Sequence, residues 1–220
     1  MCNAPATTSE HVPPKCLFPE KKDIALDDQQ SDFRKQLITV PSCDNHNGKK
    51  SKDDEYLFCL LAISILSGPK GQQQARTKVQ RILDSNKSLK EEFLKNSQQV
   101  YVQDNQSKDI TETLALTIQK ERIDSSLDSC ARALYFKEFK EKFLGDIQIV
   151  SLFLCDLDPK FNQIVESLSQ NTNKLLSEVQ PKGENPEIFT YKFFTEEGMG
   201  RVILEMNFYE ESRAIAIFKS

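Results

Sequence analysis

The sequence has few of the residues from which enzyme active sites are usually built. Its two histidines, His11 and His46, both lie in the first 52 residues, and its seven glycines are not grouped into a phosphate-binding loop. Histidine is the most common general base and a frequent metal ligand. A histidine-dependent triad or metal site is therefore excluded from the C-terminal half, and we expect no enzymatic activity, no cofactor and no small-molecule substrate.

Metal-binding patterns are also scarce. The six cysteines form no Cys-x-x-Cys pair, and Cys43 with His46 gives half of a zinc spacing without a second half-site. Asp156 and Asp158 follow an apolar segment, where some phosphotransfer enzymes hold magnesium, but helix capping explains them more simply. Gly198-Met199-Gly200 is typical of a turn between two strands. We predict no metal site.

The sequence lacks tryptophan, and its hydrophobic fraction of 38% is low for a globular chain, which indicates a folded core with disordered flanks. The net charge is −4, and residues 125–220 carry all of it. An acidic folded part does not attract phosphate backbones, so direct nucleic-acid binding is not expected. The first 30 residues contain no apolar run of a secretory signal, so we expect reduced cysteines in the nucleus or cytosol and no membrane contact.

Residues 1–52 hold five of the nine prolines among many polar residues, and we predict a disordered tail. Near its end, Lys49, Lys50 and Lys52 form a small basic cluster. Such a cluster is found in nuclear import signals, and a solvated loop explains it equally well.

A helical hairpin is predicted from Asp53 to Asp84. Acids precede an apolar run that ends at Leu66, and acids in a first turn favour a helix. The run is too short to cross a membrane, which takes about 20 apolar residues. Gly68 and Pro69 end the first helix. The second helix is amphipathic, with one face formed by Ala75, Val79, Ile82 and Leu83.

The first helix of this hairpin has more apolar surface than one partner helix can cover. Leaving three or four of its large side chains in water forgoes about 5–10 kcal/mol, which is comparable to the stability of a whole domain. The uncovered face must therefore meet a second copy of the chain, another protein, or the chain's own C-terminal half. In the last case residues 53–84 are an ordinary pair of core helices.

The hairpin resembles the BESS motif, a short helical protein-interaction module of insect chromatin and transcription proteins. The match is carried by leading acids, an aromatic residue, a Leu-Leu pair, a Gly-Pro break and a basic helix that ends in paired aliphatic residues: Asp53, Asp54, Tyr56 or Phe58, Cys59, Leu60-Leu61, Gly68-Pro69, Arg76, Lys78, Arg81 and Ile82-Leu83. Proteins with this motif often carry an upstream DNA-binding domain called MADF, and the 52 preceding residues do not supply one.

The resemblance implies a non-enzymatic nuclear adaptor that associates with itself or with other nuclear proteins. The contact is expected on the apolar residues of both helices, namely Leu57, Leu60, Leu61, Ile65, Val79, Ile82 and Leu83. The alternative is a single globular cytosolic subunit of a multiprotein complex, in which residues 53–84 are a core helix pair.

Residues 85–124 are predicted as a linker with partial structure. From 125 onward the pattern becomes regular: a helix capped by Ser125 or Ser126, a strand over 147–155, and a second helix that starts at Asp158-Pro159. Three alternating segments joined by short turns then predict antiparallel strands. The expected fold class is α+β: a disordered N-terminal tail, a helical hairpin, and a C-terminal domain at 125–220 with helices packed on an antiparallel sheet.

Overall fold

The computed structural model describes residues 5–24, 32–95, 97–103, 107–196 and 201–219, without the side chains of 44–49 and 196. A five-stranded antiparallel sheet lies at its centre, with the strands in the order β5-β9-β8-β7-β6. The mixed α+β class predicted from the sequence is confirmed. The strands are β5 (Asp146–Ser151), β6 (Lys182–Asn185), β7 (Phe189–Glu196), β8 (Arg201–Phe208) and β9 (Ser212–Lys219).

The three C-terminal segments form the expected meander. Strand β7 pairs with β8, and β8 pairs with β9, in continuous antiparallel registers that place Phe189 opposite Phe208 and Val202 opposite Phe218. Because side chains alternate across a strand, residues two apart in each strand share one face. That face carries Tyr191, Leu204, Met206 and Ala216 and belongs to the main core.

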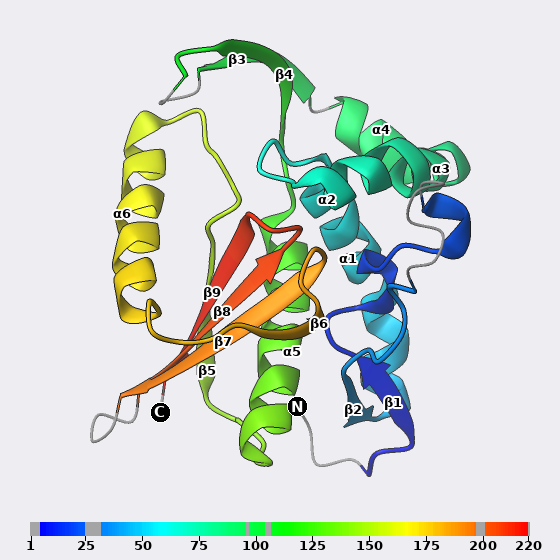
Figure 1. Ribbon diagram of the computed structural model, residues 1–220. Coiled ribbons are helices and arrows are strands. Elements are labelled where there is room, and N and C mark those ends of the chain that lie inside the picture. Colours follow the sequence, from blue (N-terminus) through cyan, green and yellow to red (C-terminus); the bar gives the residue numbers. More distant parts are fainter. Residues whose placement is uncertain (1–4, 25–31, 96, 104–106, 197–200, 220) are drawn as a thin grey trace.

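Helices lie on both faces of the sheet (Figure 1). Helix α5 (Lys120–Phe139) packs on the core face, next to β5 and β9. Helix α6 (Pro159–Leu175) lies on the opposite side, and Asp158 caps it as predicted by accepting a hydrogen bond from the backbone N–H of Lys160. Helix α5 begins five residues before the expected cap at Ser125, and Ser126 is a buried residue within it.

The predicted hairpin at 53–84 consists of two helical segments. Helix α1 (Asp44–Ile63) begins nine residues earlier than expected and ends just before the turn at Ser64. The second segment is continuous: α2 (Pro69–Gln74), a π-helical stretch η4 (Ala75–Val79) and α3 (Gln80–Ser85).

The segment 85–124 is more structured than a linker. Helix α4 (Lys87–Lys95) buries Leu89 and Phe93 in the main core. A two-stranded ribbon follows, formed by β3 (Ser97–Gln103) and β4 (Ile110–Leu116), which pair only with each other. The ribbon extends away from the body of the protein (Figure 1).

The N-terminal segment is folded where the structure describes it, whereas residues 1–4 and 25–31 of the expected tail lie outside the described residues. Strands β1 (Thr8–His11) and β2 (Thr39–Ser42) pair with each other and close a long loop. Within this loop lie the short 3₁₀ helices η1 (Lys15–Leu17) and η2 (Lys21–Asp23). The loop contributes buried side chains to the core, among them Val12, Leu17, Phe18 and Phe33.

One hydrophobic core extends from Val12 to Phe218 and includes helix α1. Truncation of α1 should therefore destabilise the whole protein. We expect Leu61→Ala to lower the free energy of unfolding by about 2–5 kcal/mol, because Leu61 is fully buried. Urea unfolding followed by circular dichroism and by tyrosine fluorescence should give coincident transitions.

Ile65→Ala is the matched control, since Ile65 is 51% exposed, and it should change the stability by less than about 1 kcal/mol. Two separate transitions in Leu61→Ala, with the sheet unfolding at the wild-type urea concentration, would contradict the shared core.

Candidate protein-interaction surfaces

The structure separates the residues that the sequence assigned to a protein contact. Leu57, Leu60, Leu61 and Val79 are buried against the rest of the chain. Ile82 and Leu83 are half-buried and pack against the same core, and Ile65 is exposed beyond the end of α1. Most of this set therefore contacts the chain's own residues in this structure, as the core-helix alternative expected.

Three neighbours surround helix α1. Helix α5 packs along one side, and α2 with η4 packs along another. The N-terminal loop covers a third side, where Cys16 Sγ lies 3.5 Å from the carbonyl oxygen of Asp54. At the end toward α4, the Tyr56 hydroxyl accepts a hydrogen bond from the backbone N–H of Gln119 at 2.9 Å. The burial deficit is thus met within the chain.

The N-terminal loop is held by side chains that donate to its main-chain carbonyls. Lys78 Nζ donates to the carbonyl of Cys16 at 2.5 Å and lies 4.9 Å from the centre of the Phe58 ring. The carbonyl of Leu17 accepts from Gln74 Nε2 at 3.2 Å and from the Tyr209 hydroxyl at 2.6 Å. Burial lowers the pKa of Lys78, and the charge of nearby Arg34 acts in the same direction.

Carboxylates of the loop add ion pairs to these hydrogen bonds. Asp23 receives two hydrogen bonds from the Arg81 guanidinium, at 2.6 and 3.1 Å. Glu20 lies within 4.0 Å of cationic groups of Lys22, Arg34, Lys78 and Arg81, and the hydrogen bond from Lys22 is the largest influence that lowers its pKa. Two of the three basic residues that the BESS-like pattern places on its second helix, Lys78 and Arg81, therefore bind this chain's own acids.

A buried charge cluster lies where the N-terminal segment meets α1 and α5. Lys50 Nζ is 2.8 Å from a Glu10 carboxylate oxygen and 3.9 Å from Asp54, which also accepts from Ser126 at 2.9 Å. Burial raises the pKa of Asp54 to about 6, against the opposing effect of Lys50. Because the side chain of Lys50 is nearly buried, the three lysines of the predicted basic cluster do not form a single exposed patch. The side chain of Lys49 is outside the part of the chain that the structure describes.

Helix α6 presents an apolar stripe to solvent. Phe161, Leu168 and Leu175 are spaced seven residues apart, and Ile164 lies between the first two. At about 100° per residue these positions fall within an arc of about 60°. Their side chains are between 40% and 61% exposed. The spacing is that of the a and d positions of a coiled-coil helix.

The side of α6 that contacts the sheet lies next to the stripe, and its contacts are largely polar. Arg213 of β9 donates to Ser169 Oγ and to Asn173 Oδ1, and it pairs with Glu205 at 3.2 Å. Thr172 is the buried residue of the helix. The helix is thus fixed through small and polar side chains, and its larger apolar residues remain outside.

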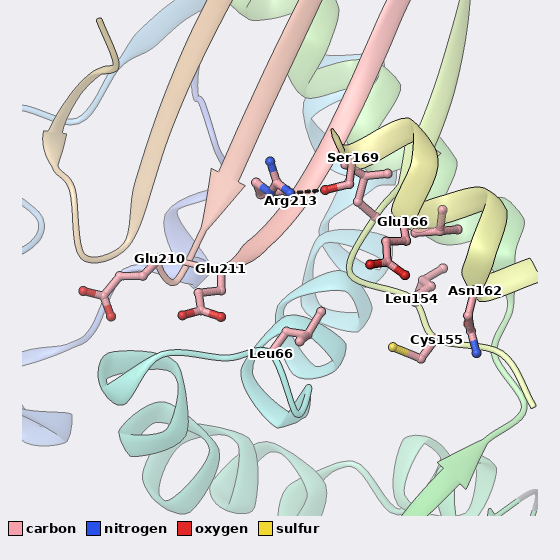
Figure 2. Close-up of a pocket in the computed structure, with 11 residues that line it drawn as sticks. Leu66, Leu154, Cys155, Asn162, Glu166, Ser169, Glu210, Glu211 and Arg213 are labelled. Atoms are coloured by element: carbon pink, nitrogen blue, oxygen red, sulfur yellow. Dashed lines mark hydrogen bonds between the residues drawn. The ribbon is translucent and has the colours of Figure 1, made fainter. Parts of the chain in front are cut away.

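A pocket of about 440 Å³ lies between the inner side of α6, the β8–β9 turn and the turn after α1 (Figure 2). Its wall is partly apolar, its charged groups are three carboxylates and an arginine, and it also contains an exposed cysteine. The lining residues are Leu66, Leu152, Leu154, Cys155, Asn162, Val165, Glu166, Ser169, Glu210, Glu211 and Arg213.

The pocket does not present an activated nucleophile. Cys155 is exposed as a residue, but its thiol is partly buried. This partial burial raises the pKa of the thiol and disfavours the reactive thiolate. Across the described residues no group of three or more histidines, cysteines and acids is arranged to hold a metal ion. The His46 side chain is not among those described, so the predicted half-site of Cys43 and His46 lies outside this finding. None of the described helices is both long and apolar enough to cross a membrane.

Comparison with protein-family models, with curated proteins and with solved structures found no match to this chain.

The α6 stripe is the exposed surface that sequence reasoning did not select. Its signal was present, because the seven-residue spacing of Phe161, Leu168 and Leu175 is readable in the sequence. The spacing alone does not show that these positions lie outside the core, because an apolar helical stripe normally faces the core.

Replacing the buried carboxyl of Asp54 should change how stability depends on pH. The folded state holds this proton more tightly than the unfolded chain, whose carboxyl has a pKa near 4. Stability from this group is therefore complete below about pH 4 and is lost as the pH rises to about 6, by on the order of 2–3 kcal/mol. Urea unfolding between pH 4 and 7 should show this loss in the wild type and its absence in Asp54→Asn.

Asp53→Asn, one residue away on the same helix, should retain the loss. Identical pH profiles for the wild type and Asp54→Asn would show that Asp54 is not protonated in the folded state.

Proposed function

We propose that this chain is a non-enzymatic adaptor that binds another protein by helix packing, with the apolar stripe of α6 as its contact surface. The observation that carries the proposal is the exposure of Phe161, Ile164, Leu168 and Leu175 on one side of a capped helix. Covering the exposed half of these four side chains is worth on the order of 3–6 kcal/mol. A helix from a partner buries such a stripe by knobs-into-holes packing.

Charge along the stripe specifies the partner's chemistry. Lys160 and Lys174 flank the outer edge of the stripe at the same heptad position, and both are exposed. The only acid within α6, Glu166, lines the pocket on the other side of the helix (Figure 2). A partner helix with glutamate or aspartate beside its own apolar stripe would pair with both lysines. We therefore assign the site to an acidic amphipathic helix of another protein.

A second copy of this chain fits the stripe less well. In an antiparallel pair centred on Leu168, Lys160 of one copy lies beside Lys174 of the other. In either direction α6 offers no acid at this edge to meet the lysines. Like charges at such positions are destabilising. A heterologous partner is the better occupant.

The hairpin at 53–84 takes a supporting role in this proposal. The burial of Leu57, Leu60, Leu61 and Val79 favours the view that it is a core helix pair within one globular subunit. The BESS resemblance remains the reason for proposing a nuclear location and nuclear partners. A cytosolic subunit of a multiprotein complex is the second candidate, and the same α6 contact would serve it.

Two designed helical peptides test the contact. Both have leucine at a and d positions over three heptads, and they differ only in carrying glutamate or lysine at the flanking e and g positions. We expect the glutamate peptide to bind the full chain at least tenfold more tightly than the lysine peptide, as measured by fluorescence anisotropy. Lys160→Glu combined with Lys174→Glu should reverse this preference, because it reverses the charge beside the stripe.

Ile164→Ser with Leu168→Ser should abolish binding of the glutamate peptide. Leu114→Ser is the matched control, since Leu114 is an exposed leucine on the ribbon, and it should leave binding unchanged. If Leu114→Ser weakens binding as much as the α6 variants do, the stripe is not the contact surface.

The nuclear assignment is tested separately by imaging the chain fused to a fluorescent protein in insect cells. We expect nuclear enrichment that persists in Lys49→Ser with Lys52→Ser, because Lys50 is held by Glu10 and Asp54 and the cluster is not presented as a unit. Uniform cytosolic fluorescence of the unmodified fusion would favour the cytosolic subunit.

A further inference from the structure

The N-terminal loop packs as a bound peptide would. Between Pro14 and Asp23 its internal backbone hydrogen bonds close only the two 3₁₀ turns, from Leu17 N to the Pro14 carbonyl and from Asp23 N to the Glu20 carbonyl, with one more at Phe18. Apart from the Lys22–Glu20 ion pair, its other side-chain hydrogen bonds and ion pairs are with residues outside this stretch, among them Lys78, Gln74 and Tyr209. The loop is closed at its base by the β1–β2 pairing and so lies on the surface of α2 and η4 as an added layer.

The surface beneath the loop recognises its main chain. Side chains of α2, η4 and the β8–β9 turn donate to three carbonyls of the loop: Lys78 to Cys16, Gln74 and Tyr209 to Leu17, and Gln73 to Asp23 at 3.0 Å. Every peptide carries carbonyl groups, so these contacts do not depend on the identity of the loop side chains. Donor side chains placed in this way bind any segment that takes up the same backbone shape and fits the adjoining pockets.

Two features of the surface select among such segments. Leu17 and Phe18 are fully or almost fully buried, and they mark two adjacent apolar pockets. Beyond them, Lys78 and Arg81 meet the carboxylates of Glu20 and Asp23. The surface therefore selects two adjacent apolar residues followed at short distance by acids.

The loop does not satisfy this surface completely. Gln74 is 1% exposed, and its Nε2 is used by the Leu17 carbonyl, but its Oε1 has no hydrogen-bond partner among the described residues. A buried acceptor without a donor costs about 1–3 kcal/mol. A segment that offers an N–H at this point would bind better than the chain's own loop.

We propose that the surface formed by α2, η4 and Tyr209 is a peptide-binding groove, which residues 14–23 occupy here and which a segment of another protein with the same two 3₁₀ turns can occupy in their place. The partner segment carries two adjacent apolar residues followed by acids. The chain's own loop then competes with the partner segment for the groove, and a higher concentration of the partner is needed for binding. This groove lies away from α6, and the proposal is independent of the contact proposed there.

A labelled peptide of residues 12–24, VPPKCLFPEKKDI, tests the groove in reducing buffer. In the full chain with Leu17→Ser and Phe18→Ser, the loop loses both apolar anchors and vacates the groove. We expect this loop variant to bind the peptide at least tenfold more tightly than the wild type does. A peptide with serine at both apolar positions should not bind the loop variant.

Two substitutions on η4, one inside the groove and one outside it, test whether the groove is the binding site. Lys78→Met in the loop-variant background should weaken peptide binding at least tenfold, because it removes the donor to the Cys16 carbonyl. Arg76→Met, on the same π-helical stretch but exposed, should leave it unchanged. If the loop variant does not fold, Glu20→Ala with Asp23→Ala replaces it, since this change removes the carboxylates that pair with Lys78 and Arg81 and keeps both apolar anchors of the loop.

A loop variant that melts cooperatively and remains monomeric, yet binds the peptide no better than the wild type, would overturn the proposal. So would a complex of the loop variant with the wild-type chain in the absence of peptide, because the wild-type loop keeps both apolar anchors, and its capture would show that the groove takes the loop of a second copy and not a separate partner segment.

Discussion

Enclosure of helix α1 is the constraint on which the rest of this structure depends. From Tyr56 to Ala62 every residue of the helix is buried, so apolar side chains cover its whole circumference. A helix that is apolar on all sides is stable only inside a core. The second half of the hairpin covers one side, α5 a second and the N-terminal loop a third. Segments from across the chain are thereby brought to one helix, and the single core that joins Val12 to Phe218 follows from it.

The sequence allowed the fold class and most elements to be predicted, and it did not allow the neighbours of α1 to be chosen. Periodicity identifies the hairpin, the meander and the cap at Asp158, because these depend on local spacing. It was also predictable that one partner helix leaves part of the apolar surface of α1 uncovered. That prediction shows only that a further neighbour is needed and does not identify it. The N-terminal loop was expected to be disordered because Leu17, Phe18 and Phe33 are isolated among prolines and charged residues. Single anchors of this kind leave no periodic signal.

Helix α6 shows why exposed surfaces are harder to predict than cores. Its stripe of Phe161, Leu168 and Leu175 has the spacing of a core-facing helix, yet the structure turns it outward. Contacts between Arg213, Ser169 and Asn173 fix the rotation of the helix on the sheet. Hydrogen bonds are directional whereas apolar packing is not, so a few polar contacts determine which side is buried. The periodicity of the sequence does not show which side of α6 these polar contacts bury.

The strand order β5-β9-β8-β7-β6 has a consequence for how the protein is made. Strand β9 lies between β5 and β8, although it is the last of the five to leave the ribosome. During synthesis about 60 residues are added after β5 before its only neighbour in the sheet, β9, begins to be made, which takes several seconds at typical rates. The Tyr209 hydroxyl that holds the N-terminal loop emerges equally late. Early segments of the nascent chain therefore remain open to chaperones until the final strand arrives.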